Sequence, residues 1–168
     1  MPEAVIIAGA NGAGKTTLAR RMLPLAHPDC IFINADEIQR EQPALSHPVA
    51  AGREMLRRLN EMVDCRRSFA IETTMSSRMY AQRIPAWKEL GYTVLLYFIE
   101  VPDADYAVKR VAMRVRAGGH DIPEADIRRR YERGLDLYES RYRQLADVCY
   151  RWRATNEGAE LVEEPFQD

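Results

Sequence analysis

The sequence predicts an α/β protein with three layers, in which helices cover both faces of a central parallel sheet. Two observations predict this class. Short apolar segments alternate along the chain with longer segments whose apolar residues recur at helical spacing. The first apolar segment, Glu3–Gly9, runs directly into a glycine-rich loop and then into a helical segment. A chain of 168 residues is long enough to bury a sizeable core in one domain.

Five apolar segments are predicted to be strands. The first, EAVIIAG, and the fourth, YTVLLYFIEVP, are almost continuously apolar, which is typical of strands buried on both faces. The second, CIFINADE, ends in polar residues. The predicted strands span 3–9, 30–37, 68–74, 92–102 and 148–154, and a sixth is indicated at 159–164 after the turn TNEG.

Five helical segments separate these strands. The first begins at Lys15 and is expected to stop at Pro24, because proline interrupts the hydrogen bonds of a helix. The second has Ser46 as its expected N-cap and Pro48 in its first turn. The fifth carries an apolar stripe at steps of three and four residues. The predicted helices span 15–23, 46–63, 77–90, 103–117 and 123–146.

The composition is that of a globular protein, with a net charge of -1 that favours neither binding nor exclusion of nucleic acid. The three cysteines, Cys30, Cys65 and Cys149, fit neither a disulfide framework nor a zinc pattern. The N-terminus lacks the basic segment of a signal peptide, and no window approaches the length of a membrane span. We therefore expect a cytoplasmic protein with reduced cysteines.

The glycine-rich loop, GANGAGKTT at residues 9–17, matches the consensus G-x-x-x-x-G-K-[ST] of phosphate-binding loops (P-loops). Its glycines let the backbone wrap closely around phosphate oxygens, and Lys15 places a positive charge on the β- and γ-phosphates. Thr16 offers a hydroxyl to Mg²⁺. The loop predicts binding of a nucleoside triphosphate through Gly9, Ala10, Asn11, Gly12, Ala13, Gly14, Lys15, Thr16 and Thr17.

Several classes of P-loop protein are excluded. The sequence lacks the N-K-x-D motif of signalling GTPases and the serine-glycine-glycine signature of transport ATPases. It is also too short for the second motor domain of a helicase. Compact kinases remain, and these need a carboxylate near the acceptor, an acid that organises the metal, and a cationic lid.

Two carboxylates are candidates for the first two roles. Asp36 follows the second predicted strand and is expected to act as the base for the acceptor hydroxyl, with the adjacent Glu37 as the fallback. Glu72 ends the third predicted strand and is expected to bind Mg²⁺ or the acceptor. Thr73 and Thr74 add hydrogen-bonding groups for the acceptor. Ligands of open parallel sheets bind at the carboxyl ends of the strands, where these residues lie.

A lid is predicted around residues 110–130, where a helix carries arginines into RVRAGGH. Arg114, and then Arg116, are expected to neutralise charge in the transition state, and His120 to donate to a phosphate. Arg110 precedes them on the same helix. Four further arginines, at 128, 129, 130 and 133, are expected on a solvated face, with Arg128 and Arg129 as the two that could reach the cleft.

The segments GANGAGKTT, INADEI, AIETT, GYTVLLYFIEVP, RVRAGGHDIPEADIRRRYERGL and ATNEG resemble, in this order, the zeta-toxin-like P-loop kinases, and most closely their compact bacterial members. The resemblance covers nearly the whole chain. It implies one P-loop kinase domain over residues 1–168 and the strand order 2-3-1-4-5. It also implies transfer of phosphate from ATP with Mg²⁺ to the 3'-hydroxyl of the amino sugar in UDP-N-acetylglucosamine.

The resemblance also carries roles to single residues. Lys15 and Thr16 match the ATP and Mg²⁺ ligands, Asp36 matches the catalytic base, and Arg114 matches an arginine on the transferred phosphate. The resemblance further places Glu72 and Thr74 in the substrate and metal region, Asn156 near adenine, and Glu54 on the substrate side. His120 stands where the toxins carry a second lid arginine. The N-terminal segment that an antitoxin engages and the long C-terminal extension are absent from this sequence.

Three functions are therefore compared. The first is an ATP-dependent kinase of a small molecule such as UDP-N-acetylglucosamine, with an antitoxin as a possible partner protein. The second is a kinase of a nucleic-acid 5'-hydroxyl or of an antibiotic. Nucleic acid is the less favoured acceptor, because the tyrosines between the arginines follow core spacing. The third is an ATP-binding regulatory module with slow hydrolysis, in which Asp36 and Glu72 organise only Mg²⁺.

Overall fold

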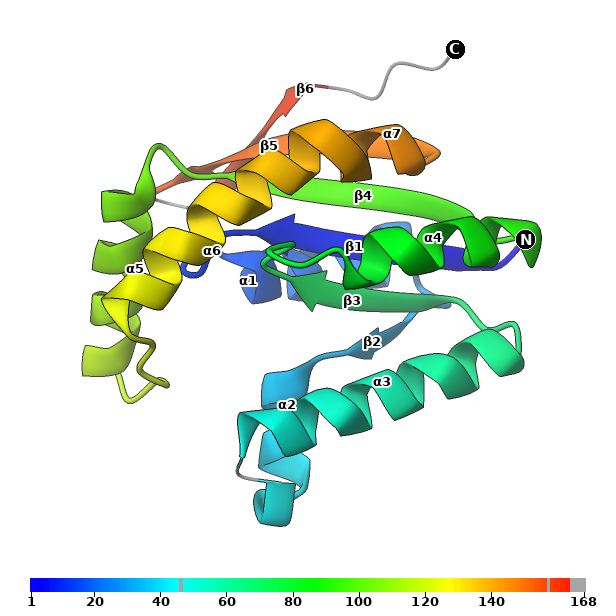
Figure 1. Cartoon of the computed structure of the whole chain (residues 1–168), viewed down its shortest axis with the longest axis horizontal. Helices are drawn as coiled ribbons and strands as arrows, with labels where there is room; N and C mark the ends of the chain where they lie inside the picture. Colours follow the sequence, from blue (N-terminus) through cyan, green and yellow to red (C-terminus); the bar gives the residue numbers. More distant parts are fainter. Residues whose placement is uncertain (46, 157, 164–168) are drawn as a thin grey trace.

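The computed structural model describes residues 1–45, 47–156 and 158–163. Within them the strands form one six-stranded sheet in the order β2-β3-β1-β4-β5-β6, with helices on both faces (Figure 1). Strands β1 to β5 are parallel, and β6 is antiparallel to β5. The predicted class and the order 2-3-1-4-5 are confirmed, with β6 added at one edge. No helix among these residues is both long and apolar enough to cross a membrane.

Strand β1 (Glu3–Gly9) occupies the centre of the sheet, between β3 (Phe69–Thr73) and β4 (Thr93–Glu100). Its residues from Ala4 to Ala8 have no exposed surface. A strand covered by helices on both faces must be apolar at consecutive positions, which explains the segment EAVIIAG. The other strands are β2 (Ile31–Ile33), β5 (Val148–Thr155) and β6 (Gly158–Glu163).

Alternate side chains of β1 enter two separate cores, because successive residues of a strand point to opposite faces. Val5 and Ile7 pack with residues of α1 and α5, whereas Ile6 packs with residues of α3, α4 and the end of α6. Figure 1 shows α1 behind the sheet and α3, α4 and α6 in front of it. These helices are α1 (Lys15–Ala26), α3 (Pro48–Asp64), α4 (Met79–Glu89), α5 (Ala104–Arg116) and α6 (Glu124–Leu137).

The predicted end of the first helix is wrong. Helix α1 continues through Pro24 to Ala26, and the N–H of His27 donates to the carbonyl of Leu23 at 2.9 Å. A proline removes one backbone donor from the helix. Since Pro24 lies in the last turn, the helix ends only two residues later in any case.

The predicted second strand is too long. Strand β2 ends at Ile33, and a short helix α2 (Ala35–Glu41) follows, then a 3-10 turn at Pro43–Leu45. Asn34 is the N-cap of α2, and its Oδ1 accepts from the N–H groups of Asp36 and Glu37 at 2.7 and 3.3 Å. An asparagine followed by acidic residues is a typical helix start, and this signal in NADE was missed.

The second predicted helix begins one residue later than expected. Pro48 lies in the first turn of α3 as predicted, but the N-cap is His47, whose Nδ1 accepts from the N–H of Val49 at 3.3 Å. The expected cap, Ser46, lies outside the described residues.

The long helix predicted over 123–146 is divided into three helical segments. Helix α6 passes into a π-helical segment η2 (Tyr138–Tyr142) and then into α7 (Arg143–Leu145). A π-turn contains one more residue than an α-turn, which a stripe with steps of three and four does not predict. Both Tyr138 and Tyr142 are buried at this segment, and the Tyr138 ring stacks on Phe98 of β4 at 3.8 Å between centroids.

Helix α6 holds the loop that follows β3. A Cβ atom on Gly134 would lie 2.5 Å from the carbonyl oxygen of Thr74, so the helix can approach this loop only because it has a glycine there. The next residue, Met75, is fully buried with a φ of 57°, a conformation uncommon for residues other than glycine. Tyr142 donates to the carbonyl of Ser77 at 2.6 Å.

We predict that Gly134→Ala destabilises the protein, although alanine ordinarily favours a helix over glycine. The added methyl group must push α6 from Thr74, which costs about 1–3 kcal/mol in the free energy of unfolding. Gly52→Ala is the matched control, because Gly52 is also helical and a Cβ atom there would meet nothing within 4 Å. This control should stabilise by about 0.5–1 kcal/mol. Urea unfolding measures both; equal stabilisation by the two substitutions would contradict the predicted contact.

Candidate active site

The P-loop connects β1 to α1. Gly12 has a φ of 78°, and a Cβ atom there would lie 2.7 Å from Cβ of Arg110 on α5. Gly14 has a φ of 91° and is the N-cap of α1. These left-handed conformations favour glycine and turn the loop so that the N-terminus of α1 begins at Lys15. A helix N-terminus attracts phosphate through its free N–H groups and its dipole.

Lys15 lies over this loop. Its Nζ donates to the carbonyl oxygens of Gly9 and Ala10, each at 2.9 Å. Burial lowers the pKa of the Lys15 ammonium from 10.5 to about 8, against the attraction of the Glu72 carboxylate. The site therefore holds a cation whose burial is unfavourable and whose charge an incoming phosphate would stabilise.

Thr16 and Glu72 lie in direct contact. The Thr16 hydroxyl donates to Oε2 of Glu72 at 2.9 Å, which links the P-loop to the end of β3. Burial raises the pKa of Glu72, and the negative charge of Asp36 raises it further, while Lys15 and the Thr16 hydrogen bond oppose this shift. A hydroxyl and a carboxylate oxygen are the ligand types that Mg²⁺ prefers. The pair therefore fits a magnesium ion bound beside the phosphates.

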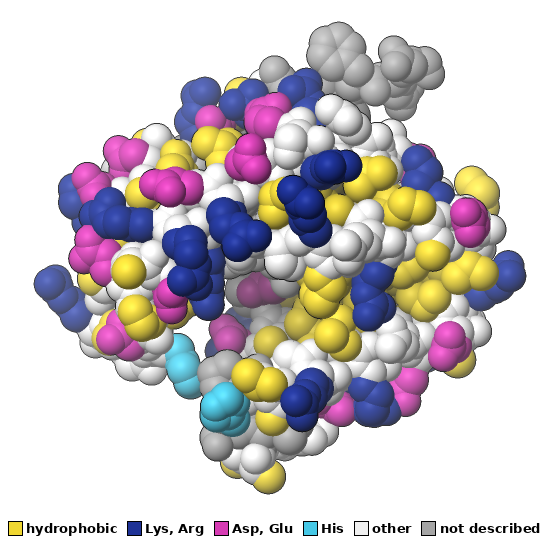
Figure 2. Space-filling view, viewed as in Figure 1, with side chains coloured by type: hydrophobic (Ala, Val, Ile, Leu, Met, Phe, Trp, Pro, Cys, Tyr) yellow, Lys and Arg dark blue, Asp and Glu magenta, His cyan; other side chains and the backbone are white. Residues whose placement is uncertain are grey.

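A cavity of about 710 Å³ contains these groups. That volume is typical of a small-molecule site. Figure 2 shows a hollow in the middle of this face, with acidic side chains inside it and Lys and Arg side chains beside it. Of the predicted residues, the cavity brings together Asn11, Gly12, Gly14, Lys15, Thr16, Thr17, Asp36, Glu72, Thr73, Thr74, Arg110, Arg114 and His120.

Asp36 reaches the cavity from the first turn of α2, where the Asn34 cap fixes the start of the helix. Glu37, the fallback base, is not among the residues that line it and pairs instead with Arg20 at 3.1 Å. Arg114 lies in the last turn of α5, and its Nη2 donates to the carbonyl of His120 at 3.1 Å. This bond connects the end of α5 to the loop before α6.

Of the residues predicted for catalysis or acceptor binding, Arg116 and Glu54 lie outside this cavity, and of the predicted nucleotide-binding residues Gly9, Ala10, Ala13 and Asn156 do not line it. Arg116 is exposed on α5 and is not part of the cavity lining. Glu54 lies on α3, where it accepts from Arg57 and Arg58, and these hydrogen bonds lower its pKa to about 2. Glu54 faces a separate hollow beside β2, away from the P-loop cavity. The geometry gives neither residue a direct contact with the transferred phosphate.

Asn156 lines a second cavity, of about 430 Å³, on the other side of the P-loop. This cavity shares Gly14, Thr17 and Arg110 with the first and is bounded by α1 and by the turn between β5 and β6. Among the described residues, the buried Nε1 of Trp152 in its wall has no hydrogen-bond acceptor. A mostly apolar cavity next to a phosphate loop fits a nucleobase.

Residues 1–151 match the family described as Zeta toxin. The chain belongs to the zeta toxin family. A Haemophilus influenzae protein described as uncharacterized is 29% identical over 133 residues, which are 77% of this chain and 92% of that protein.

Two solved structures are similar to this zeta toxin family member. One belongs to the PezAT toxin–antitoxin system of Streptococcus pneumoniae, with a TM-score of 0.69 and 18% identity over 98% of this chain and 72% of that one. The other is a gluconokinase from Sinorhizobium meliloti, with a TM-score of 0.56 and 16% identity over 92% of this chain and 83% of that one. At these identities the likeness establishes the shared P-loop kinase fold.

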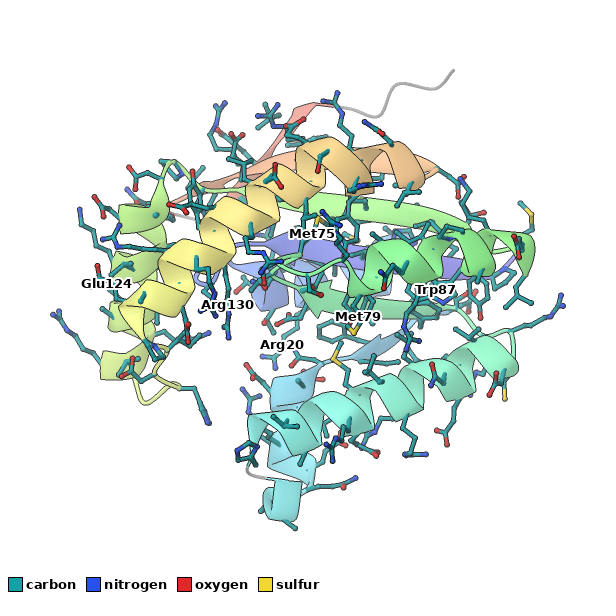
Figure 3. The ribbon with its side chains drawn as sticks, in the orientation of Figure 1. Arg20, Met75, Met79, Trp87, Glu124 and Arg130 are labelled. Carbon is teal, nitrogen blue, oxygen red and sulfur yellow. The ribbon has the colours of Figure 1, made fainter. Side chains whose placement is uncertain are left out.

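The cationic side chains of α6 are distributed differently from the prediction. Arg128 pairs with Asp105 and Glu124, and Arg129 pairs with Asp126. Arg130, which was assigned to a solvated face, lines the cavity instead, and its charge lowers the pKa of Lys15. Figure 3 shows Arg130 projecting from α6 toward the middle of the molecule.

Sequence reasoning also missed the other lining residues Ala35, Gln39, Ala51, Asp121, Ile122, Pro123 and Asp126. Four of them lie in or next to the GGHDIPEADI segment, where the loop before α6 folds over the P-loop. The sequence identifies this motif but does not predict where its individual side chains lie, because a loop has no periodic pattern of buried residues.

Lys15 gives a pH-dependent prediction. Bound phosphates favour the protonated ammonium, so binding above pH 8 should take up a proton and nucleotide affinity should fall as the pH rises from 7 to 9.5. Calorimetry in buffers of different ionisation enthalpy measures this proton. In Lys15→Arg the guanidinium stays protonated, so the proton uptake should disappear. Equal proton uptake by both proteins would contradict the assignment to Lys15.

Proposed function

We propose that this protein is an ATP-dependent kinase that transfers the γ-phosphoryl group to a hydroxyl of a small molecule. The observation that carries this proposal is that one cavity contains the P-loop lysine, the Thr16–Glu72 pair and Asp36. Transfer to a hydroxyl needs a carboxylate beyond the metal-binding pair and space for the acceptor beside it, and this cavity has both. Membership of the zeta toxin family supports the same class of reaction.

The nucleotide is proposed to bind across both cavities. Its base would enter the 430 Å³ cavity beside Asn156, and its phosphates would lie on the P-loop. Thr16 and Glu72 would hold Mg²⁺, which neutralises the phosphate oxygens during transfer. Lys15, Arg114 and Arg130 would bind the oxygens of the transferred group, because all three line the larger cavity.

Asp36 is proposed to accept the proton of the acceptor hydroxyl. That oxygen forms a bond to the γ-phosphorus while the bond between this phosphorus and the β–γ bridging oxygen breaks, and ADP leaves. The Asn34 cap holds Asp36 in the first turn of α2, beside the cavity. Positioning of the acceptor and electrostatic stabilisation supply most of the rate in such reactions.

UDP-N-acetylglucosamine is the acceptor that the resemblance implies, and it is the first compound to test as a substrate. We also propose that the chain is a single kinase domain with residues 110–130 as its lid. An antitoxin protein stays a candidate partner, since the similar Streptococcus pneumoniae structure comes from a toxin–antitoxin system.

Asp36→Asn tests the proposed base. It should lower the rate of acceptor phosphorylation about 10²- to 10⁴-fold and change ATP affinity less than about twofold. Asp64→Asn, at the exposed end of α3, is the matched control and should keep the wild-type rate. The assay follows a mass gain of one phosphate on the acceptor. Full transfer by Asp36→Asn would remove Asp36 from the mechanism.

Arg130→Gln tests the role of Arg130, the cavity arginine that the sequence did not predict. Loss of one preorganised charge on the transferred phosphate should lower kcat about 10²- to 10³-fold. Arg133→Gln is the control, because Arg133 is an exposed arginine of the same helix that lines neither cavity, and it should leave kcat essentially unchanged. Steady-state kinetics on both variants compare the two positions; similar losses would show that α6 acts through stability alone.

A further inference from the structure

A third hollow, of about 630 Å³, adjoins the catalytic cavity on the far side of Asp36. The two share Asp36, Gln39, Arg114 and His120, so they form one continuous space. The P-loop residues that line the catalytic cavity do not line this hollow. An acceptor in this hollow would therefore contact Asp36 from the side opposite the phosphates. In-line transfer requires the acceptor to lie on that side.

Of the four charged side chains of helix α2, two form ion pairs and two line the hollow. Glu37 pairs with Arg20 at 3.1 Å, and Glu41 pairs with Arg58 at 2.9 Å. Asp36 and Arg40 both line the hollow. Within the part of the chain that the structure describes, neither forms an ion pair, although charges four residues apart on a helix ordinarily attract each other. Among the described residues, Arg40 is therefore a cation without an ion-pair partner at the acceptor end of the site.

Over the described ranges, the remaining wall of this hollow has no large side chain. Small residues, Ala117, Gly118 and Gly119, form one side of it, and Pro43 lies on another. No Phe, Tyr or Trp lies among the described residues that line either this hollow or the catalytic cavity. The imidazole of His120 is the one aromatic ring among these described lining residues on which a base could stack, whereas hydroxyl groups and one anionic group would find several polar partners.

Helix geometry limits the size of the acceptor. Four residues span about 6 Å along an α-helix, so Asp36 and Arg40 lie one turn apart on the same face. A hydroxyl at Asp36 and a charged group at Arg40 would then be about 6–10 Å apart, allowing for the length of the arginine side chain. A chain of four to six carbon atoms covers this distance.

We propose that the acceptor is a compact polyhydroxylated anion, a sugar acid or a sugar phosphate, whose charged group binds Arg40 while one of its hydroxyls contacts Asp36. A guanidinium binds either a carboxylate or a phosphate through two parallel hydrogen bonds. The phosphoryl group, the proton and the leaving ADP move as in the proposed kinase reaction, on which this inference rests. A nucleotide sugar is thereby disfavoured as the acceptor.

Three probes with the same carbon skeleton test the anionic group: glucose, glucuronate and glucose 6-phosphate. Each is incubated with ATP and Mg²⁺, and the product is measured by its mass gain of one phosphate. At least one of the two anions should have a kcat/KM more than 10-fold above that of glucose. The better of the two identifies the charged group as a carboxylate or a phosphate.

Arg40→Gln should lower kcat/KM for the preferred anion about 10- to 100-fold, mainly through KM, while the KM for ATP and the rate with glucose stay unchanged. Arg40→Lys should recover part of the loss, because the charge is restored without the planar fork. Arg53→Gln is the matched control, since Arg53 is exposed on α3 and does not line the hollow. If Arg40→Gln loses both its activity and its thermal stability, Arg40→Lys takes its place in the comparison with Arg53→Gln.

A metabolite extract extends the test beyond these probes. The extract is passed over charcoal to remove compounds with bases, separated by anion exchange, and incubated with labelled ATP. Label should pass to the anionic fraction in an Arg40-dependent manner. UDP-N-acetylglucosamine, which charcoal removes from the extract, is assayed beside it as a pure compound. Transfer to this compound or to the neutral fraction that Arg40→Gln leaves unchanged would overturn this inference and keep the kinase. ADP formation without label transfer to any probe or fraction would overturn both.

Discussion

The hydrogen bond between Thr16 and Glu72 is the contact on which the site depends, because it joins the start of α1 to the end of β3, which are distant in the sequence. It forms because β1 and β3 are parallel and paired so that Ile7 lies beside Glu72. Parallel pairing brings the carboxyl ends of the strands to the same edge of the sheet. The P-loop, the end of β3 and the start of α2 therefore surround one cavity, and burial there shifts the pKa values of both Lys15 and Glu72.

The arginines of this protein differ in whether a neighbouring acid pairs with them. On α6, Arg128 and Arg129 are neutralised by neighbouring carboxylates, which leaves Arg130 to face the P-loop. On α2 the two glutamates are engaged by Arg20 and Arg58, which leaves Asp36 and Arg40 to face the acceptor side. Ion pairing thus occupies several of the charges around the cavities, and one partner, Asp126, itself lines the catalytic cavity. Exposed pairs of this kind add little stability, so this occupation of charges is their main effect.

Close backbone contacts hold these groups in place. Gly134 lets α6 approach Thr74, and the π-helical segment that follows buries Tyr138 and Tyr142 against the sheet and the loop after β3. The same loop contains Met75 in a left-handed conformation. Local strain of this type is common beside functional sites, where the surrounding packing maintains it.

The sequence by itself determined the layer architecture, the P-loop and the positions of Asp36 and Glu72 at the strand ends. Each of these follows from local patterns: apolar runs, a glycine spacing, and polar residues directly after a strand. Only the tertiary structure decided that Arg130 rather than Arg128 or Arg129 reaches the cavity, and that Glu54 lies away from it. The physical reason is that an arginine or glutamate can reach several partners, and the acids and arginines it meets come from segments that only the folded chain brings together.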